Sequence, residues 1–186
     1  MKIAQRVIAG CLILAAVLCL SGCGVSHRSP EGVVKSLIKA YGKGSIKQAA
    51  ECYGTSKKEM GEGLQKEIEA VLRYLDAHKQ KKIRILECGK ISQDKDAAYV
   101  YITYNLVLED GQEYPCIGTY MTSKGDGKKY NIIEPSEITE DLSTWAARDY
   151  VQFMTSDAYK EYRRTYDTFV KKNPGYEDKI TERLTE

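Results

Sequence analysis

The spacing of hydrophobic residues predicts three amphipathic helices between residues 29 and 75. Ser29-Pro30-Glu31 is typical of a helix start, because Ser caps free N–H groups, Pro fits the first turn and Glu suits the helix dipole. Ser45 and Ser56 open the second and third helices with capping boxes. The three helices are expected to share one core. Their predicted apolar faces are Val34, Leu37, Ile38 and Tyr41; Ile46, Ala49, Ala50 and Tyr53; and Met60, Leu64, Ile68, Val71, Leu72 and Leu75.

From Ile83 the hydrophobic period changes to two, which predicts β-strands. Turn signals at residues 93–96, 110–111 and 125–127 separate four strand-like runs, so an antiparallel meander is the simplest topology. Two-residue turns at Asp94-Lys95 and Asp110-Gly111 would fix the register. The expected core face is Ile83, Ile85, Ile91, Val100, Ile102, Tyr104, Leu106, Ile117 and Met121. The expected outer face is Arg84, Cys88, Lys90, Tyr99, Tyr101, Thr103, Asn105, Tyr114, Cys116 and Tyr120.

Residues 136–186 carry two further apolar stripes and predict a C-terminal helical extension. In one interpretation these helices cover the Tyr-rich outer face of the sheet. In the other they present a surface for a partner protein, since aromatic side chains supply large contact areas. The candidate partner-binding residues are Trp145, Phe153, Tyr159, Tyr162 and Phe169.

The N-terminus has the organisation of an export signal. Lys2 and Arg6 precede 14 consecutive non-polar residues, 7–20, which as a helix would cover about 21 Å of a roughly 30 Å hydrocarbon core. The following Leu20-Ser21-Gly22-Cys23 resembles the lipobox of bacterial lipoproteins at all four positions. That resemblance implies a diacylglycerol thioether on Cys23 as the mature N-terminus, and hence anchoring at the outer face of the cytoplasmic membrane. A plain cleavage site is the alternative.

A second resemblance concerns residues 29–134. "SPEGVVKSLIKAYGKGSIKQAAECY", followed by a longer helix and a meander with "LEDGQEY" and "GDGKKYNII", resembles nuclear-transport-factor-2-like (cystatin-like) domains. The resemblance implies an α+β fold in which N-terminal helices pack on a curved four-stranded antiparallel sheet, forming a cone. Members of this family use the cone for small ligands, for isomerase or dehydratase chemistry, or for protein contacts, so the fold alone does not choose a function. The expected organisation is a signal peptide at 1–22, a tether at 23–29, the domain at 30–135 and the extension at 136–186.

Composition narrows the classes of partner. The chain has 186 residues, of which 42% are hydrophobic and 29% charged, which suits one globular domain with appendages. From Cys23 onward 26 basic residues balance 26 acidic ones, with no long basic run. Nucleic acid is therefore not expected as a partner.

Candidate chemistry is sparse. His27 lies in the tether and His78 at the end of the third helix, so neither is expected as a base inside the cone. The expected register puts Glu87 on the core face, where burial would suit a carboxyl to proton transfer, unless a bulge at Cys88-Gly89 turns it outward. Ser36 and Lys39 fit S-x-x-K, but the companion motifs of that enzyme class are absent from the sequence.

The cysteines do not indicate a disulfide framework. Cys11 and Cys19 would leave with the signal peptide, so Cys52, Cys88 and Cys116 are expected as free thiols. No cofactor or metal site is expected. Two classes of function stay open: a non-catalytic binding or scaffold module for an envelope protein or a small apolar ligand, and a small isomerase- or hydrolase-like enzyme that uses the cone pocket.

Overall fold

The computed structural model describes residues 24–185, so the predicted signal peptide and Cys23 lie outside the described residues. The class is α+β. Helices α2 (Pro30–Gly42), α3 (Ile46–Cys52) and α4 (Glu62–Ala77) come first, and a curved sheet follows with strand order β1-β2-β3-β4. The strands are β1 (Gln80–Asp94), β2 (Ala97–Leu108), β3 (Glu113–Lys124) and β4 (Tyr130–Ile132), paired antiparallel as a meander. The predicted class and topology are therefore confirmed.

The first two helices begin where the sequence predicts. The Ser29 side chain accepts a hydrogen bond from the backbone N–H of Gly32, and Ser45 accepts one from Gln48. The predicted start of the third helix is wrong. Ser56 and Glu59 form only a single turn, in which Ser56 Oγ donates to Glu59 Oε2 at 2.7 Å. Gly61 then adopts an extended conformation, and α4 begins after it.

The β2–β3 register differs by one residue from the expected one. Val107 pairs with Glu113, and the N–H of Leu108 donates to the carbonyl of Gln112 at 2.8 Å. This bond closes a loop of three residues, 109–111, with Gly111 at a φ of 83°. A one-residue shift exchanges the two faces of a strand. The face predictions for β3 are therefore wrong: Ile117 and Met121 lie on the outer face, opposite Thr103 and Tyr99. The residues brought to the core face instead are Tyr114, Cys116 and Tyr120.

Strand β1 contains three irregularities, which divide it into segments of different register. One lies between Ile85 and Glu87, so Glu87 points outward and Cys88 packs inward, contrary to the predicted faces of both. Another lies between Lys90 and Ser92. Ile91, which was predicted on the core face, lies there on the outer face. The outward bulge considered for Glu87 is thus present, but it precedes the residue instead of following it.

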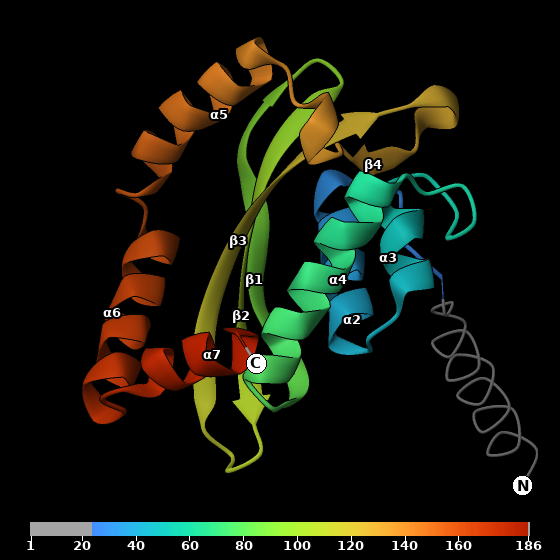
Figure 1. Ribbon diagram of the computed structural model, residues 1–186. Coiled ribbons are helices and arrows are strands. Elements are labelled where there is room, and N and C mark those ends of the chain that lie inside the picture. The colour runs from blue at the N-terminus through green and yellow to red at the C-terminus, as the bar shows by residue number, and fades with distance from the viewer. Residues whose placement is uncertain (1–23, 186) are drawn as a thin grey trace, which may run out of the picture.

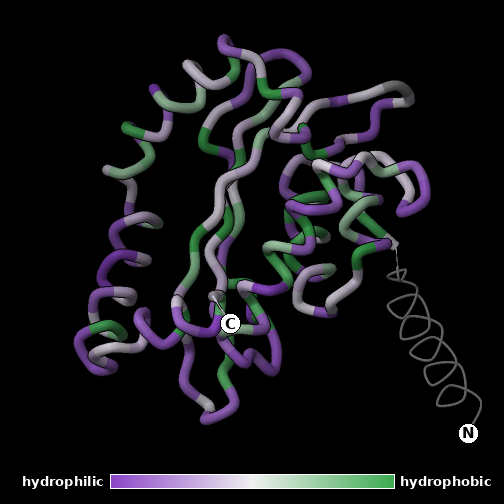
Figure 2. Tube along the Cα trace, in the orientation of Figure 1, coloured by the Kyte–Doolittle hydropathy of each residue, from purple (hydrophilic) through white to green (hydrophobic). Residues whose placement is uncertain are grey.

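The helices that follow the sheet lie on its other side. After η1 (Asp126–Lys128) and η2 (Pro135–Glu137), α5 (Glu140–Phe153) and α6 (Asp157–Lys172) face the side opposite α2 to α4, and α7 (Tyr176–Thr185) returns to α4 (Figure 1). The trace of α6 is mostly hydrophilic (Figure 2), yet its Phe169 belongs to the same core cluster as Val33 and Leu37. Helix α6, and α7 through Tyr176, therefore share the core of the preceding fold.

Two isoleucines, Ile102 and Ile117, provide a test of the observed register. Ile102 is fully buried between the sheet and the N-terminal helices, so Ile102→Ala should lower the free energy of unfolding by about 2 to 5 kcal/mol. Ile117 is half-exposed on the outer face, so Ile117→Ala should cost only about 1 kcal/mol. Urea unfolding of both variants measures the difference. Equal losses would contradict the register described above.

Candidate functional site

The end of the cone near β3 is filled with aromatic side chains. His78, the C-cap of α4, is only 2% exposed, and its ring centroid lies 4.5 Å from that of Tyr114 and 4.6 Å from that of Tyr74. Its Nδ1 lies 2.9 Å from the Tyr176 hydroxyl on α7. His78, expected merely at a helix end, is thus a buried residue of this cluster.

Helix α7 is held against this cluster by polar contacts. The hydroxyls of Tyr114 and Tyr166 both donate to Oε1 of Glu177, at 2.8 and 3.0 Å. Arg183 donates from Nη1 to the carbonyl oxygen of Ala77 at 2.6 Å, satisfying an acceptor at the end of α4. The C-terminal helix therefore closes the end of the cone at which His78 lies.

Burial lowers the pKa of His78 to about 4, while the charge of Glu177 acts in the opposite direction and Arg183 adds to the lowering. Its Nε2 has no hydrogen-bond partner. A neutral ring that is fixed and enclosed in this way contributes to packing, and a substrate would reach it only after α7 moved.

A continuous series of ring contacts joins this cluster to the outer face of the sheet. Neighbouring ring centroids are 4.5 to 6.1 Å apart, the range of favourable aromatic contacts. We call this series the aromatic ladder. It runs through Tyr101, Phe153, Tyr159, Tyr162, Tyr166, Tyr114, His78 and Tyr74.

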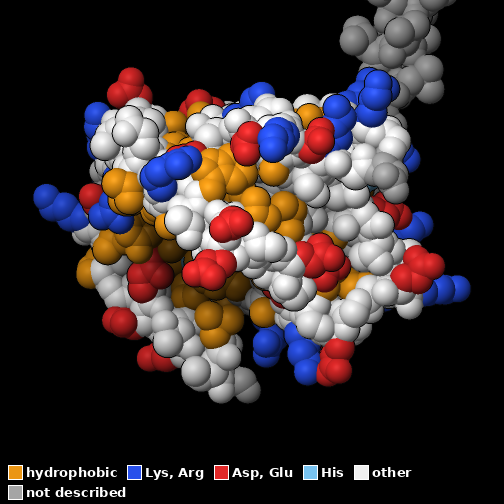
Figure 3. Space-filling model, turned by 90° about the horizontal axis from the view of Figure 1, so that it is seen from above, with side chains coloured by type: hydrophobic (Ala, Val, Ile, Leu, Met, Phe, Trp, Pro, Cys, Tyr) orange, Lys and Arg blue, Asp and Glu red, His pale blue; other side chains and the backbone are white. Residues whose placement is uncertain are grey.

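An open groove lies where α5 meets α6 over the outer face of β1 and β2. Its volume is about 620 Å³, and we call it the α5 groove. Hydrophobic side chains gather with acidic and basic ones on the side of the molecule that carries α5 (Figure 3). A second hollow of about 400 Å³ lies between α5 and β3 and includes Tyr99, Ile117 and Tyr150. The α5 groove is lined by Glu87, Lys90, Ile91, Tyr101, Asp149, Gln152, Phe153, Thr155, Ser156 and Ala158.

Glu87 takes part in this groove and not in the cone. The Tyr101 hydroxyl donates to its Oε1 at 2.5 Å, and the Tyr101 ring packs in a tilted arrangement against that of Phe153, with centroids 4.7 Å apart. Burial, together with the nearby Glu87 carboxylate, raises the pKa of Tyr101 above its usual value. The tyrosine therefore stays protonated and acts as the donor.

Asp149 forms the other acidic wall of the groove. Trp145 donates to it from Nε1 at 2.6 Å, and Arg148 donates from Nε at 2.8 Å. Hydrogen bonding by Arg148 lowers the pKa of Asp149, so the carboxylate is charged. The groove thus has carboxylates at two places, and its lining also includes Lys90, whose ammonium donates to Gln93 Oε1 at 2.7 Å.

The five aromatic residues considered for partner contact occupy different environments. Phe153 and Phe169 are buried, and Tyr159 and Tyr162 are half-buried in the aromatic ladder. Trp145 is half-buried and bonded to Asp149. Of the five, only Phe153 lines the α5 groove. Apart from Glu87, no local pattern marks the other groove residues as a site, because the lining comes from four elements, β1, β2, α5 and α6, and from the link between α5 and α6.

The remaining sequence candidates have structural roles. Ser36 donates to the carbonyl of Gly32 at 2.8 Å and accepts from the N–H of Ser26, so its hydroxyl is engaged with backbone. Cys52, Cys88 and Cys116 are free thiols, as predicted, and burial raises the pKa of each to about 12. Within residues 24–185 no His, Cys, Asp and Glu side chains are grouped to hold a metal ion.

The chain is thus an α+β protein whose helices pack on both sides of a curved antiparallel sheet. No family model matches it, and no curated protein does so either. Among solved structures, one from Campylobacter jejuni, described as a candidate NTF2-like transpeptidase, is similar with a TM-score of 0.36 and 18% identity. The alignment covers 57% of this chain and 98% of that one. A similarity of this size carries no argument about function.

The buried His78 predicts an acid-sensitive fold. The unfolded chain protonates histidine near pH 6.5, whereas the folded protein resists protonation until about pH 4, so the unfolded state binds more protons between these values. The free energy of unfolding should therefore fall as the pH drops from about 6.5 to 4, by at most about 3 kcal/mol from this group.

Urea unfolding at a series of pH values measures this dependence. His78→Phe keeps a ring in the aromatic cluster but cannot titrate, so its stability should vary less over that interval. His27→Gln is the matched control and should keep the wild-type dependence. If His78→Phe has the same pH dependence as wild type, the assignment to His78 is wrong.

Proposed function

We propose that this protein is a lipid-anchored, non-catalytic binding module of the cell envelope, which holds a segment of another envelope protein in the α5 groove. The observation that carries the binding role is the placement of the accessible surface. The cone end at His78 is closed by α7, whereas the α5 groove is open and combines aromatic with charged walls.

Support for the anchor comes from the sequence. The four positions 20–23 match the lipobox, and the first helix cap, Ser29, follows Cys23 by only six residues. Six extended residues reach roughly 20 Å, so the folded part would stay near the outer face of the cytoplasmic membrane. Within residues 24–185 no helix has the length and apolar character needed to cross a bilayer.

A protein segment fits the α5 groove better than a small apolar ligand does. Such a ligand would cover Glu87, Lys90 and Asp149 without adding to the hydrogen bonds that they already make within the protein, and removing charged groups from water without new hydrogen bonds is costly. A peptide can answer these charges with its backbone and side chains while placing an apolar residue on Phe153.

The enzymatic alternative would use the Glu87–Tyr101 pair, since a carboxylate bonded to a second polar group in a groove is a possible acid–base arrangement. We favour binding because Glu87 is exposed to solvent, where a carboxylate lacks the desolvation that suits it to proton transfer near neutral pH.

The anchor proposal predicts the outcome of Cys23→Ser. Removal of the thiol should prevent diacylglycerol transfer and abolish lipid labelling of the protein, and the chain should lose its normal location. Intact-mass measurement of the membrane-extracted wild type should find a diacylglyceryl Cys23 at the N-terminus. A wild-type N-terminus at any other residue would exclude the lipobox assignment.

The groove proposal is tested by photo-cross-linking in intact cells. A photoreactive residue at Gln152, which lines the α5 groove, should capture a defined envelope protein, while one at the exposed Lys160 on α6 should not. Ala158→Trp would fill the groove and should reduce the Gln152 adduct about tenfold, corresponding to about 1.4 kcal/mol of binding free energy. Lys160→Trp is the matched control, and the unfolding midpoints of both variants establish that they fold.

Two results would contradict this proposal. The first is a Gln152 adduct that is equally abundant in wild type and in correctly folded Ala158→Trp. The second is turnover of a small substrate that disappears in Glu87→Gln, which would establish the enzymatic alternative. Capture of a lipid or metabolite in place of a protein would show that the occupant is a small ligand.

A further inference from the structure

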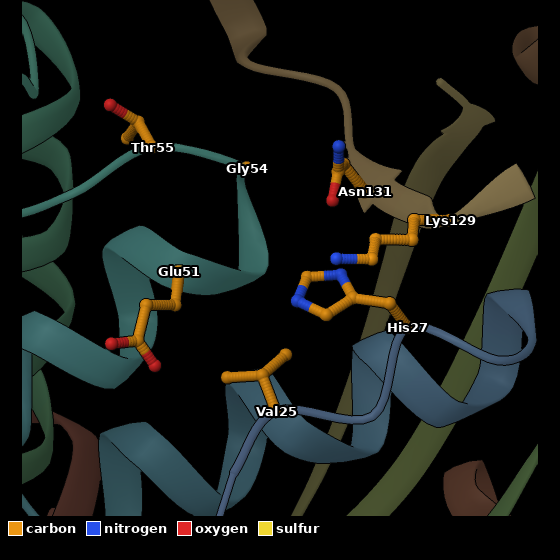
Figure 4. A pocket seen from close by; sticks show the side chains of 7 residues that line it. All are labelled: Val25, His27, Glu51, Gly54, Thr55, Lys129 and Asn131. Atoms are coloured by element: carbon orange, nitrogen blue, oxygen red, sulfur yellow. The ribbon is translucent and has the colours of Figure 1, made fainter. Parts of the chain in front are cut away.

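A separate polar hollow lies at the start of the described chain. It has a volume of about 410 Å³ and is formed by the tether, the end of α3 and the loop that leads into β4 (Figure 4). It involves none of the α5 groove residues. The hollow is lined by Val25, His27, Glu51, Gly54, Thr55, Lys129 and Asn131.

The His27 ring is fixed with one nitrogen toward the hollow. Its Nδ1 lies 2.8 Å from the carbonyl oxygen of Tyr130, and the N–H of Tyr130 donates to the carbonyl of His27 at 3.0 Å. A carbonyl oxygen only accepts, so Nδ1 carries the hydrogen and Nε2 is left for a ligand. Figure 4 shows Nε2 and the ammonium of Lys129 directed into the same space.

The rim of the hollow needs a residue without a side chain at position 54. Gly54 has a φ of 80°, and a Cβ at this position would come within 2.6 Å of the Asn131 amide nitrogen. Glycine therefore allows the end of α3 to approach the start of β4 closely. This approach brings Glu51 of α3 to the wall across from His27 and Lys129 (Figure 4).

The two walls have opposite electrostatic character. Lys129 can donate charge-assisted hydrogen bonds to phosphate oxygens, which are the strong ones, and Nε2 of His27 can donate there when it carries a hydrogen. Glu51 is half-buried, and its only ion pair in the described chain is a long one, 3.9 Å to the exposed Lys47. Its carboxylate can therefore accept hydrogen bonds from an ammonium group.

We propose that this hollow binds phosphoethanolamine, with the phosphate toward His27 and Lys129 and the ammonium toward Glu51. The same chemistry occurs in a phospholipid headgroup and in free phosphoethanolamine. The membrane is the favoured source, and this choice rests on the proposed lipid anchor. Residues 24–27 span at most about 14 Å, so an anchored chain would hold the hollow within reach of the headgroups.

The first experiment titrates the full-length chain, purified in detergent, with O-phosphoethanolamine. Calorimetry measures the affinity. In NMR spectra, binding should shift the ring resonances of His27, which are readily assigned because the chain has two His. Lys129→Gln should weaken binding about tenfold. Lys128→Gln removes the same charge from the same loop but outside the hollow, and should leave the affinity unchanged. Glu51→Gln should remove the preference for O-phosphoethanolamine over inorganic phosphate.

The second experiment identifies the source. The full-length chain, with a photoreactive residue at Thr55, is reconstituted in vesicles of equal parts phosphatidylethanolamine and phosphatidylcholine. Adducts enriched in phosphatidylethanolamine would support the membrane source, because phosphatidylcholine has no N–H to offer Glu51. Equal adducts together with binding of free O-phosphoethanolamine would assign the site to the soluble compound.

The inference is overturned if O-phosphoethanolamine does not bind, or if Lys129→Gln and Lys128→Gln bind it equally well. Neither result depends on lipid at Cys23 or on the α5 groove, so failure of this inference is distinguishable from failure of the proposed function.

Discussion

The arrangement of this protein depends on the aromatic ladder, through which the C-terminal helices are attached to both the outside and the end of the sheet. Phe153 contacts Tyr101 on the outer face, and Tyr166 contacts Tyr114 at the other extreme. Each such contact contributes only about 0.5 to 1.5 kcal/mol beyond the area it buries. Because successive rings share neighbours, α5 and α6 are positioned together and their contributions are expected to be coupled. Tyr176 of α7 joins them through its ring contacts with His78 and Tyr114.

Closure by α7 determines where a ligand can reach the protein. Glu177 accepts hydrogen bonds from two tyrosines and Arg183 satisfies a carbonyl at the end of α4, so α7 is fixed by polar bonds as well as by packing. The interior at that end is occupied by side chains. The open surfaces described here are instead formed between elements, at the α5 groove and at the polar hollow beside the tether.

These two surfaces suit different tasks. The hollow begins two residues after the predicted lipidation site, and its wall residue His27 is fixed by hydrogen bonds with Tyr130 at the start of β4. The α5 groove is built on the far side of the sheet from α2 and α3 (Figure 1). An envelope module anchored at its N-terminus could thus contact lipid through one surface and a protein through the other.

The sequence by itself determined the helix starts at Ser29 and Ser45, the meander and the α+β class, because caps, turn residues and hydrophobic periods act over a few neighbouring positions. It also supplied the resemblance of residues 20–23 to a lipobox. Tertiary structure decided which strand residues face the core and where the candidate sites lie. A three-residue loop in place of two turned Ile117 outward, and a bulge did the same for Glu87. His78 is buried between Tyr114 of β3 and Tyr176 of α7, which lies 98 residues later in the chain, and no local pattern encodes these contacts.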